Sequence, residues 1–313
     1  MSIVVLAGGV GGAKFAHGVM QALPNPADLT VVVNVGDDFE HFGLKICPDL
    51  DTVCYTLAEL ENPATGWGRQ GESWRVMEAV AALDGPDWFR LGDLDLATHL
   101  ERTRRLRAGE PLSAITAAFC RAWGVPARVL PVSDHPIPTV VLTDEGEMAF
   151  QEYFVHRRWQ PRVRGFRFAG VVQARPAPGV LDALRIASAV LLAPSNPFVS
   201  IDPILAVPGV RAALAGKPVV AVSPIVGGKA VKGPAAKMFR ELGVEPSAPA
   251  VAEHYRGVVS HFVLDTTDAA QAAAVRRHVP RVLVTDTLMT SPEKRRRLAE
   301  KVLAWLRDEH DTI

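Results

Sequence analysis

The chain has 313 residues, enough for a large buried core and for either two domains or one α/β unit with an insertion. Its 34 basic and 34 acidic side chains balance, so no net field draws it to nucleic acid or a membrane surface, and we expect neither as a partner. No apolar stretch approaches the roughly 18 residues that a membrane span needs. The first apolar run lacks a basic leader and a cleavage pattern, so it predicts a strand rather than a signal peptide. We therefore expect a cytoplasmic protein.

Valine-rich runs recur along the chain, and most are followed by a turn signal and a helical pattern. Continuous apolar strands that alternate with helices are typical of a parallel sheet covered on both faces. We therefore expect a single α/β domain over residues 1–313, built on a Rossmann-like, doubly wound, mostly parallel sheet. The predicted strands are residues 2–7, 29–34, 189–193, 218–222, 261–265 and 281–285.

The middle of the chain departs from this rhythm. Residues 52–123 show helical patterns with little strand signal, and we expect this helical insert to form an acceptor pocket or a lid over the carboxyl edge of the sheet. The segments 139–143 and 147–155 flank Asp144-Glu145-Gly146, which predicts a β-hairpin. A final helix is expected to begin at Ser291.

A glycine-rich loop, Gly8-Gly9-Val10-Gly11-Gly12-Ala13-Lys14, directly follows the first predicted strand. Glycine lets a backbone approach a phosphate closely, and the following helix points its N-terminal amides at the anion. The loop is not a Walker motif, since Phe15 stands where Ser or Thr is required, and Lys14 replaces the third glycine of the dinucleotide fingerprint. The alternative is a tight turn without a ligand. We expect a phosphate-binding loop whose substrate-binding residues are Gly9, Gly11, Gly12 and Lys14.

Two groups of acidic residues follow the second predicted strand: Asp37-Asp38, and then Asp49 with Asp51. The loop after strand 2 lies beside the loop after strand 1, at the edge where α/β proteins bind ligands. Carboxylates beside phosphates indicate Mg²⁺, which takes a few protein oxygens together with substrate oxygens. We expect Asp37 and Asp49 to be metal ligands with a catalytic role. The alternative is helix capping, with Asp51 at the start of a helix.

A third cluster comprises Arg90, Asp95 and His99. Asp95 belongs either to the site or to the cap of the helix that runs through His99. His99 is a candidate substrate-binding residue, although a lone histidine on a helix is more often structural. The arginines that follow are expected on the solvated face of this helix: Arg102, Arg104, Arg105 and Arg107.

Two later loops carry polar or basic residues. In Pro194-Ser195-Asn196-Pro197, Ser195 and Asn196 suit hydrogen bonds to a base or ribose. Residues 223–233 form a second glycine-rich turn, for which an anion contact and simple turn chemistry are both open.

No triad, nucleophile elbow or zinc motif stands out. A glycine loop with carboxylates and basic loops is typical of proteins that position and neutralise a transferring phosphoryl group without covalent help.

At these motifs the chain closely resembles the 2-phospho-L-lactate transferase (CofD-type) family, including its phosphoenolpyruvate transferase members. The resemblance runs in order from Met1 to the final helix, so it covers essentially the whole chain. It is carried by the glycine loop, Asn34-Val35-Gly36-Asp37-Asp38, Pro48-Asp49-Leu50-Asp51-Thr52, residues 91–99, Phe150-Gln151-Glu152-Tyr153, residues 194–205, residues 223–228 and Thr285-Asp286-Thr287-Leu288-Met289.

The resemblance implies an Mg²⁺-dependent step in coenzyme F420 biosynthesis. A guanosine-diphospho derivative of phospholactate or phosphoenolpyruvate donates its phospho-acid to the ribityl hydroxyl of the deazaflavin Fo, and GMP leaves. Asp51 and Arg90 match positions for deazaflavin binding, and Asp51 is also our catalytic candidate to orient the hydroxyl or accept its proton. Asp37 and Asp49 match the acidic positions near the metal. The nucleotide-side loops correspond to residues 9–12, Ser195 and Asn196.

Two positions depart from the family pattern, and some alternatives stay open. Leu94 stands where the family commonly has Arg, and Asp202 stands where it commonly has Gly. The runner-up function is a sugar-nucleotide-binding regulatory protein of a related family, and the failed dinucleotide fingerprint disfavours a nicotinamide dehydrogenase. The sequence does not decide the donor acid or the oligomeric state, for which a homodimer is one option.

Overall fold

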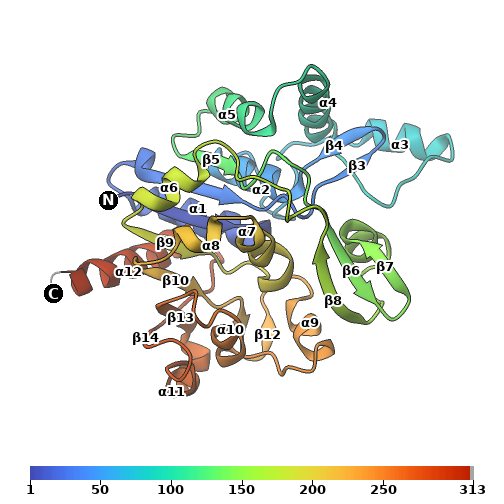
Figure 1. The fold of residues 1–313 in the computed structure, drawn as a ribbon. Helices are drawn as coiled ribbons and strands as arrows, with labels where there is room; N and C mark the ends of the chain where they lie inside the picture. The colour runs from blue at the N-terminus through green and yellow to red at the C-terminus, as the bar shows by residue number, and fades with distance from the viewer. Residues whose placement is uncertain (311–313) are drawn as a thin grey trace.

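A computed structural model describes residues 1–310, and a seven-stranded sheet lies at their centre (Figure 1). Its strands all run parallel, in the spatial order β14-β13-β10-β9-β1-β2-β5. The expected doubly wound α/β sheet is therefore confirmed. Its strands are β1 (Ile3–Ala7), β2 (Leu29–Val33), β5 (Arg128–Pro131), β9 (Ala189–Leu192), β10 (Val219–Val222), β13 (His261–Asp265) and β14 (Arg281–Thr285).

The order of the strands reverses between β1 and β9. The chain first adds β2 and β5 on one side of β1, and then places β9, β10, β13 and β14 on the other side. Every residue of β1 and β9 is buried, because helices cover both faces of the sheet there. In open α/β sheets the ligand crevice lies at the carboxyl ends of the strands, where the order reverses. The loops that leave β1 and β9 therefore meet at the place where a ligand is expected.

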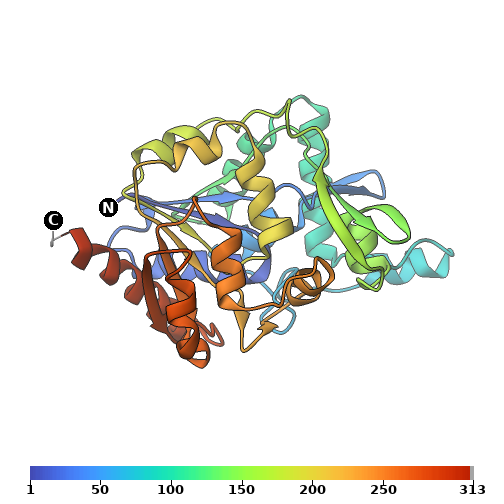
Figure 2. The same cartoon turned by 60° about the horizontal axis from the view of Figure 1, so that its bottom comes forward.

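Helices lie on both faces of the sheet (Figure 2). On one face, α2 (Pro48–Leu57) and α12 (Pro292–His310) both pack against α1 (Gly9–Ala22). Gly18 of α1 has no room for a side chain, because a Cβ there would meet the carbonyl of Arg295 in α12. The other face carries the yellow helices of Figure 2, which are α6 (Val180–Ile186), α7 (Asp202–Ala206) and α8 (Val210–Ala213).

The expected helical insert is present, but it is not helical throughout. Residues 58–74 form turns and an isolated bridge between Glu61 and Arg69. A short antiparallel hairpin that the sequence did not predict precedes the insert, and the two share a small apolar cluster of Ile46, Met77 and Leu91. Whether the insert acts as an acceptor pocket or a lid stays a prediction. The elements of this region are β3 (Phe39–His41), β4 (Leu44–Ile46), α3 (Arg75–Ala82), α4 (Asp93–Arg107) and α5 (Leu112–Ala122).

The predicted hairpin is part of a three-stranded antiparallel sheet of β6 (Thr139–Thr143), β7 (Gly146–Ala149) and β8 (Val163–Phe168), in the order β7-β6-β8. Its second strand ends at Ala149, so the predicted extension to residue 155 is wrong. Residues of that extension instead form the π-helical segment η2 (Glu152–His156). The Gln151 side chain is buried and donates a hydrogen bond to the backbone carbonyl of Asp37 at 3.2 Å, which turns the chain toward the main sheet.

The remaining elements are short and connect these layers. None of the helices within residues 1–310 combines the length and apolar character needed to cross a membrane. These short elements are η1 (Pro26–Asp28), η3 (Pro197–Ile201), β11 (Ile225–Val226), β12 (Lys229–Ala230), α9 (Ala235–Glu241), α10 (Ala248–His254), η4 (Thr266–Gln271) and α11 (Ala272–Val275).

Candidate active site

The glycine loop lies at the reversal of the strand order and packs directly against the loop after β9. The Gly8 amide donates to Ser195 Oγ at 3.2 Å, and that hydroxyl donates to the Gly8 carbonyl at 2.7 Å. A Cβ at Gly11 would lie 2.7 Å from the Pro194 carbonyl oxygen, and one at Gly12 would lie 2.6 Å from Ser195 Oγ. Gly9 has φ of +62°, which favours glycine. The structure therefore brings Gly11 and Gly12 against the loop of Ser195, and Gly9 lies beside Asp49, while their role in binding substrate stays a prediction.

Asn34, directly after β2, joins two of the predicted carboxylates. Its Nδ2 group donates to Asp49 Oδ2 at 2.9 Å and to Asp37 Oδ1 at 3.2 Å. The other oxygen of Asp49 accepts the Gly9 amide at 2.7 Å, so the carboxylates adjoin the first turn of α1. Asn34 was not among the predicted site residues. The signal was available, because a polar amide ended a predicted buried strand.

Burial and mutual repulsion make this carboxylate pair costly to ionise. Burial raises the pKa of Asp37 well above its usual value and the Asp49 carboxylate raises it further, against the hydrogen bond from Asn34. Burial likewise raises the pKa of Asp49 to about 6, although Asn34 and the Gly9 amide lower it. Among residues 1–310, neither carboxylate forms an ion pair with a basic side chain. Two buried carboxylates without a counter-cation fit a divalent cation such as Mg²⁺.

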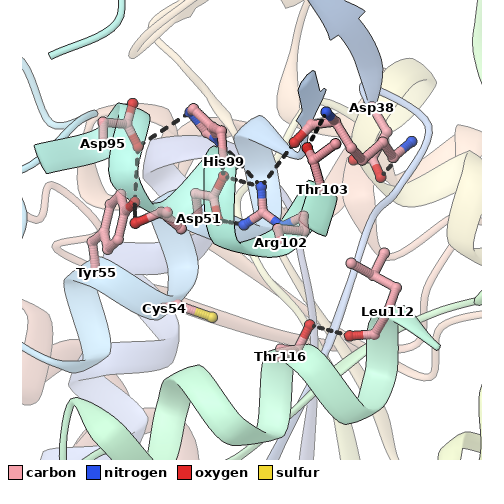
Figure 3. A network of polar contacts seen from close by, with 12 residues as sticks. Asp38, Asp51, Cys54, Tyr55, Asp95, His99, Arg102, Thr103, Leu112 and Thr116 are labelled. Atoms are coloured by element: carbon pink, nitrogen blue, oxygen red, sulfur yellow. Dashed lines mark hydrogen bonds and ion pairs between the residues drawn. The ribbon is translucent and has the colours of Figure 1, made fainter. Parts of the chain in front are cut away.

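Asp51 lies in a separate buried network between α2 and α4 (Figure 3). Both of its oxygens accept hydrogen bonds from the Arg102 guanidinium, Oδ1 from Nη2 and Oδ2 from Nη1 at 3.0 Å. Arg102 is 2% exposed, so its predicted place on a solvated face is wrong. The capping alternative for Asp51 is also wrong, because α2 begins at Pro48 and Asp51 lies inside its first turn.

His99 and Asp95 complete this network. The guanidinium of Arg102 lies 3.2 Å from His99 Nδ1, and His99 Nε2 lies 3.4 Å from Asp95 Oδ1. Asp95 also accepts a hydrogen bond from the Tyr55 hydroxyl at 2.8 Å and lies within α4, so it does not cap that helix. Asp51, Asp95 and His99 are close enough to hold a metal ion. The guanidinium already neutralises Asp51 there, so this cluster fits a cation less well than Asp37 and Asp49 do.

The spacing of residues along α4 carries a signal for the burial of Arg102. Asp95, His99 and Arg102 are spaced at i, i+4 and i+7, so they share one face of α4. That face packs toward α2, which explains why a charged side chain could be buried there against Asp51.

Arg90 lies outside this network. It is exposed, and its guanidinium lies over the Trp74 ring, 4.5 Å from the ring centroid. The start of α4 next to it is held by Glu72, whose carboxylate accepts the Leu94 and Asp95 amides at 2.7 and 2.9 Å. The structure thus places Arg90 on the insert, on the same helical lobe as the Asp51 network.

The predicted binding residues Lys14 and Asn196 lie close to the glycine loop. Burial lowers the pKa of Lys14, and the nearby Arg295 lowers it further. Lys14 in turn contributes to a lowered pKa of Lys232, from the second glycine-rich turn, after the effect of burial. The side chain of Asn196 caps η3 by accepting the Phe198 amide at 3.1 Å. These residues therefore flank the glycine loop.

Comparison with known proteins assigns the chain to a family. The family model described as 2-phospho-L-lactate transferase CofD matches residues 3–300. The chain belongs to this family. A phosphoenolpyruvate transferase of Streptomyces griseus is 48% identical over 97% of this chain and 100% of its own, and one of Mycolicibacterium smegmatis is 44% identical over 94% and 95%. A Bacillus halodurans protein of the UPF0052 family shares the fold, with a TM-score of 0.61 and 15% identity over 96% of this chain and 98% of its own.

The structure shows the environments of Asp202 and Leu94, the two residues that depart from the CofD family pattern. Asp202 begins α7, and both of its oxygens lie 3.0 Å from His254 Nε2 in α10. Its side chain is thus engaged by a neighbouring helix. Leu94 is 41% exposed in the first turn of α4, so an arginine at this position would extend into solvent on the side of the insert.

Proposed function

We propose that this CofD family member transfers phosphoenolpyruvate or phospholactate from its guanosine-diphospho derivative to the ribityl hydroxyl of Fo, releasing GMP, in coenzyme F420 biosynthesis. Family membership supports the class of reaction. The relatives named phosphoenolpyruvate transferase favour phosphoenolpyruvate as the acid. The observation that carries the proposal is the buried pair of Asp37 and Asp49 beside the first turn of α1.

The first turn of α1 is suited to the diphosphate of the donor. The first amides of a helix have no carbonyl one turn earlier to bond to. Asp49 accepts a hydrogen bond from the Gly9 amide, so the amides of Val10 and Gly11 would be the ones that donate to a bound anion. Lys14 and Lys232 add positive charge beside this turn.

Asp37 and Asp49 would hold the metal, with Asn34 fixing their orientation. Mg²⁺, when bound, would neutralise charge on the diphosphate and make both buried carboxylates stable in their ionised form. Within residues 1–310 neither carboxylate is paired with a basic side chain, which favours a metal, because an ion pair would already have compensated the negative charge.

In the transfer, the ribityl oxygen forms a bond to the phosphorus that carries the three-carbon acid. The bond from that phosphorus to GMP breaks and GMP leaves with the electron pair, while the proton of the hydroxyl, which Asp51 would accept, is released to solvent. The hydroxyl must lie in line with the leaving group, within about 3.5 Å of the phosphorus. Asp51 and Arg90 would bind the acceptor from the insert side, with Asp51 accepting a hydrogen bond from a ribityl hydroxyl.

A binding experiment separates this function from that of a sugar-nucleotide-binding regulator. The melting temperature of the purified protein is measured with Fo, GDP and a UDP-sugar, each with and without Mg²⁺, because ligands of the native state raise apparent stability. We expect shifts with Fo and with GDP, and a larger GDP shift with Mg²⁺. A shift with the UDP-sugar and none with Fo would overturn the proposal.

A further inference from the structure

Arg102 has an unusual position for a charged side chain. It lies on α4 with 2% exposure and is among the largest fully buried side chains in residues 1–310. Burying a guanidinium is costly unless a counter-charge and hydrogen bonds accompany it. Although burial lowers it, the pKa of Arg102 is raised above its ordinary value because the Asp51 carboxylate stabilises the charge.

The contact with Asp51 is a two-point fork. One guanidinium nitrogen faces each carboxylate oxygen, so the plane of the Asp51 carboxylate is fixed relative to α4. A fork of this kind adds geometric specificity that a single ammonium contact lacks. Each carboxylate oxygen keeps a further lone pair for another donor.

The same guanidinium also connects Asp51 to the hairpin that precedes the insert. Arg102 Nη1 lies 3.3 Å from the Lys45 carbonyl oxygen in β4, and the Lys45 amide donates to Thr103 Oγ1 at 2.8 Å. Lys45 Nζ in turn lies 3.3 Å from Asp38 Oδ2, next to Asp37. Arg102 therefore joins α2, α4 and β4 at one point.

On its other side Arg102 orients His99. A guanidinium only donates hydrogen bonds, so His99 Nδ1 is the acceptor in its contact with Arg102, and His99 Nε2 lies 3.4 Å from Asp95 Oδ1. The Tyr55 hydroxyl lies 2.8 Å from Asp95 Oδ1 and 2.8 Å from Thr98 Oγ1, which extends the buried polar network beside Asp51. This network leaves the Asp51 carboxylate with one orientation relative to α2.

We propose that Arg102 is a positioning residue for the acceptor: it acts through Asp51, whose carboxylate it holds in the orientation that binds the ribityl chain. This rests on the proposed function, because it takes Asp51 as an acceptor-binding residue. It predicts that Arg102 affects binding of the deazaflavin and leaves binding of the nucleotide, on the α1 side, unchanged.

The test is a double-mutant cycle with steady-state kinetics. Asp51→Asn, Arg102→Gln and the double variant are compared for the KM of Fo, the KM of the donor, kcat and melting temperature. We expect each single variant to raise the KM of Fo by roughly ten- to a hundredfold, as loss of a charge-assisted hydrogen bond does, with a donor KM within about twofold of the wild type. Because Arg102 acts through Asp51, the double variant should be no worse than Asp51→Asn alone.

Two further variants control for folding. Arg102→Lys keeps the charge but loses the fork, and it replaces Arg102→Gln in the cycle if that variant does not fold. Arg105→Gln changes an arginine of the same helix that pairs with Glu110 on the outside, and it should leave every kinetic constant within about twofold.

Three results are distinguishable. If the increase in the KM of Fo in the double variant equals the product of the increases in Asp51→Asn and Arg102→Gln, the two residues act independently, and the positioning role is overturned. A lowered melting temperature with an unchanged KM of Fo would mean that Arg102 is only structural. Absence of Fo turnover by the wild-type protein would instead reject the proposed function.

Discussion

The buried carboxylates near the glycine loop differ in what neutralises them. Asp38 and Asp51 each face a basic side chain, whereas, within residues 1–310, Asp37 and Asp49 are contacted by the neutral amide of Asn34 and, for Asp49, the Gly9 amide. Buried charges without a partner destabilise a fold, and they persist where a ligand compensates them. The uncompensated pair therefore marks the expected cation site at the level of single residues.

Replacing either member of this pair should separate stability from activity. We expect Asp37→Asn and Asp49→Asn to keep or raise the melting temperature of the Mg²⁺-free protein, because each removes charge repulsion. Turnover should fall at least roughly a hundredfold, since the metal loses a ligand. Calorimetry and an activity assay on the same samples test this. Near-normal turnover combined with early melting would contradict it.

Stability should also depend on pH through Asp49. An unfolded aspartate has a pKa of about 3.9, and the folded value is about 6. Between these values the native state keeps a proton that the unfolded state releases, so stability from this group falls as the pH rises through 6. Mg²⁺ binds the ionised form and should raise the melting temperature more at about pH 7.5 than at about pH 5. An equal shift at both pH values would argue against Asp49 as a ligand.

At the scale of elements, the loops after β1 and β9 fit together without spare room. A Cβ at Gly11 would meet the backbone of Pro194, and one at Gly12 would meet the side chain of Ser195. The glycines are thus needed for packing as well as for any approach of a phosphate. The Asp51–Arg102 pair plays a comparable part in the insert, because it fixes α4 against α2. Motion of the insert is therefore expected in residues 58–74 rather than in α4.

A substitution in the glycine loop should therefore affect both stability and binding. In Gly11→Ala the new Cβ would lie 2.7 Å from a backbone oxygen that cannot rotate away. We expect a loss of stability of roughly 1–3 kcal/mol, as for other overpacked sites, together with weaker GDP binding. Denaturant unfolding and GDP titration measure the two effects. Unchanged values of both would remove this loop from the site.

A substitution of Asp202 should affect stability but not nucleotide preference. Because Asp202 is engaged by His254, Asp202→Gly should reduce the free energy of unfolding by roughly 1 kcal/mol or less, given that the pair is partly exposed. The affinity ratio between GDP and ADP should stay within about twofold. A clear change in that ratio would place Asp202 in direct contact with the base.

The elements that the sequence predicted well are those with strong local signals. β1 and β9 are continuous apolar runs, and the glycine loop predicts the start of α1. β5 was missed because it is a four-residue strand at the edge of the sheet. The extension of β7 failed because Gln151 and Tyr153 pack inward, and tertiary packing overrides strand propensity.

The candidate site was predictable to a similar extent. Residue type and loop position predicted that Asp37 and Asp49 lie at the ligand edge, and the structure brings them together there, while their role as metal ligands stays a prediction. Pairings across long sequence separations were not visible. The fork between Asp51 and Arg102 and the bridge made by Asn34 depend on how α4 and β2 meet α2 in the folded chain.

At the scale of the whole molecule, the reversal of strand order divides the site into two sides. The loop after β9 and the start of α1 lie on one side, and the insert, which carries Arg90, lies on the other, next to Asp51 of α2. Under the proposed function, the nucleotide donor would bind the first side and the acceptor the second. A homodimer stays a prediction, which sedimentation velocity can test.

The most direct test of the central claim is a mass spectrum of the reaction products. Purified protein is incubated with Fo, Mg²⁺ and the guanosine-diphospho derivative of either phosphoenolpyruvate or phospholactate, with a chelator control. We expect GMP and Fo carrying the phospho-acid, formed faster with phosphoenolpyruvate, and no product with the chelator. Unmodified Fo with both donors, while the protein is folded and binds GDP, would contradict it.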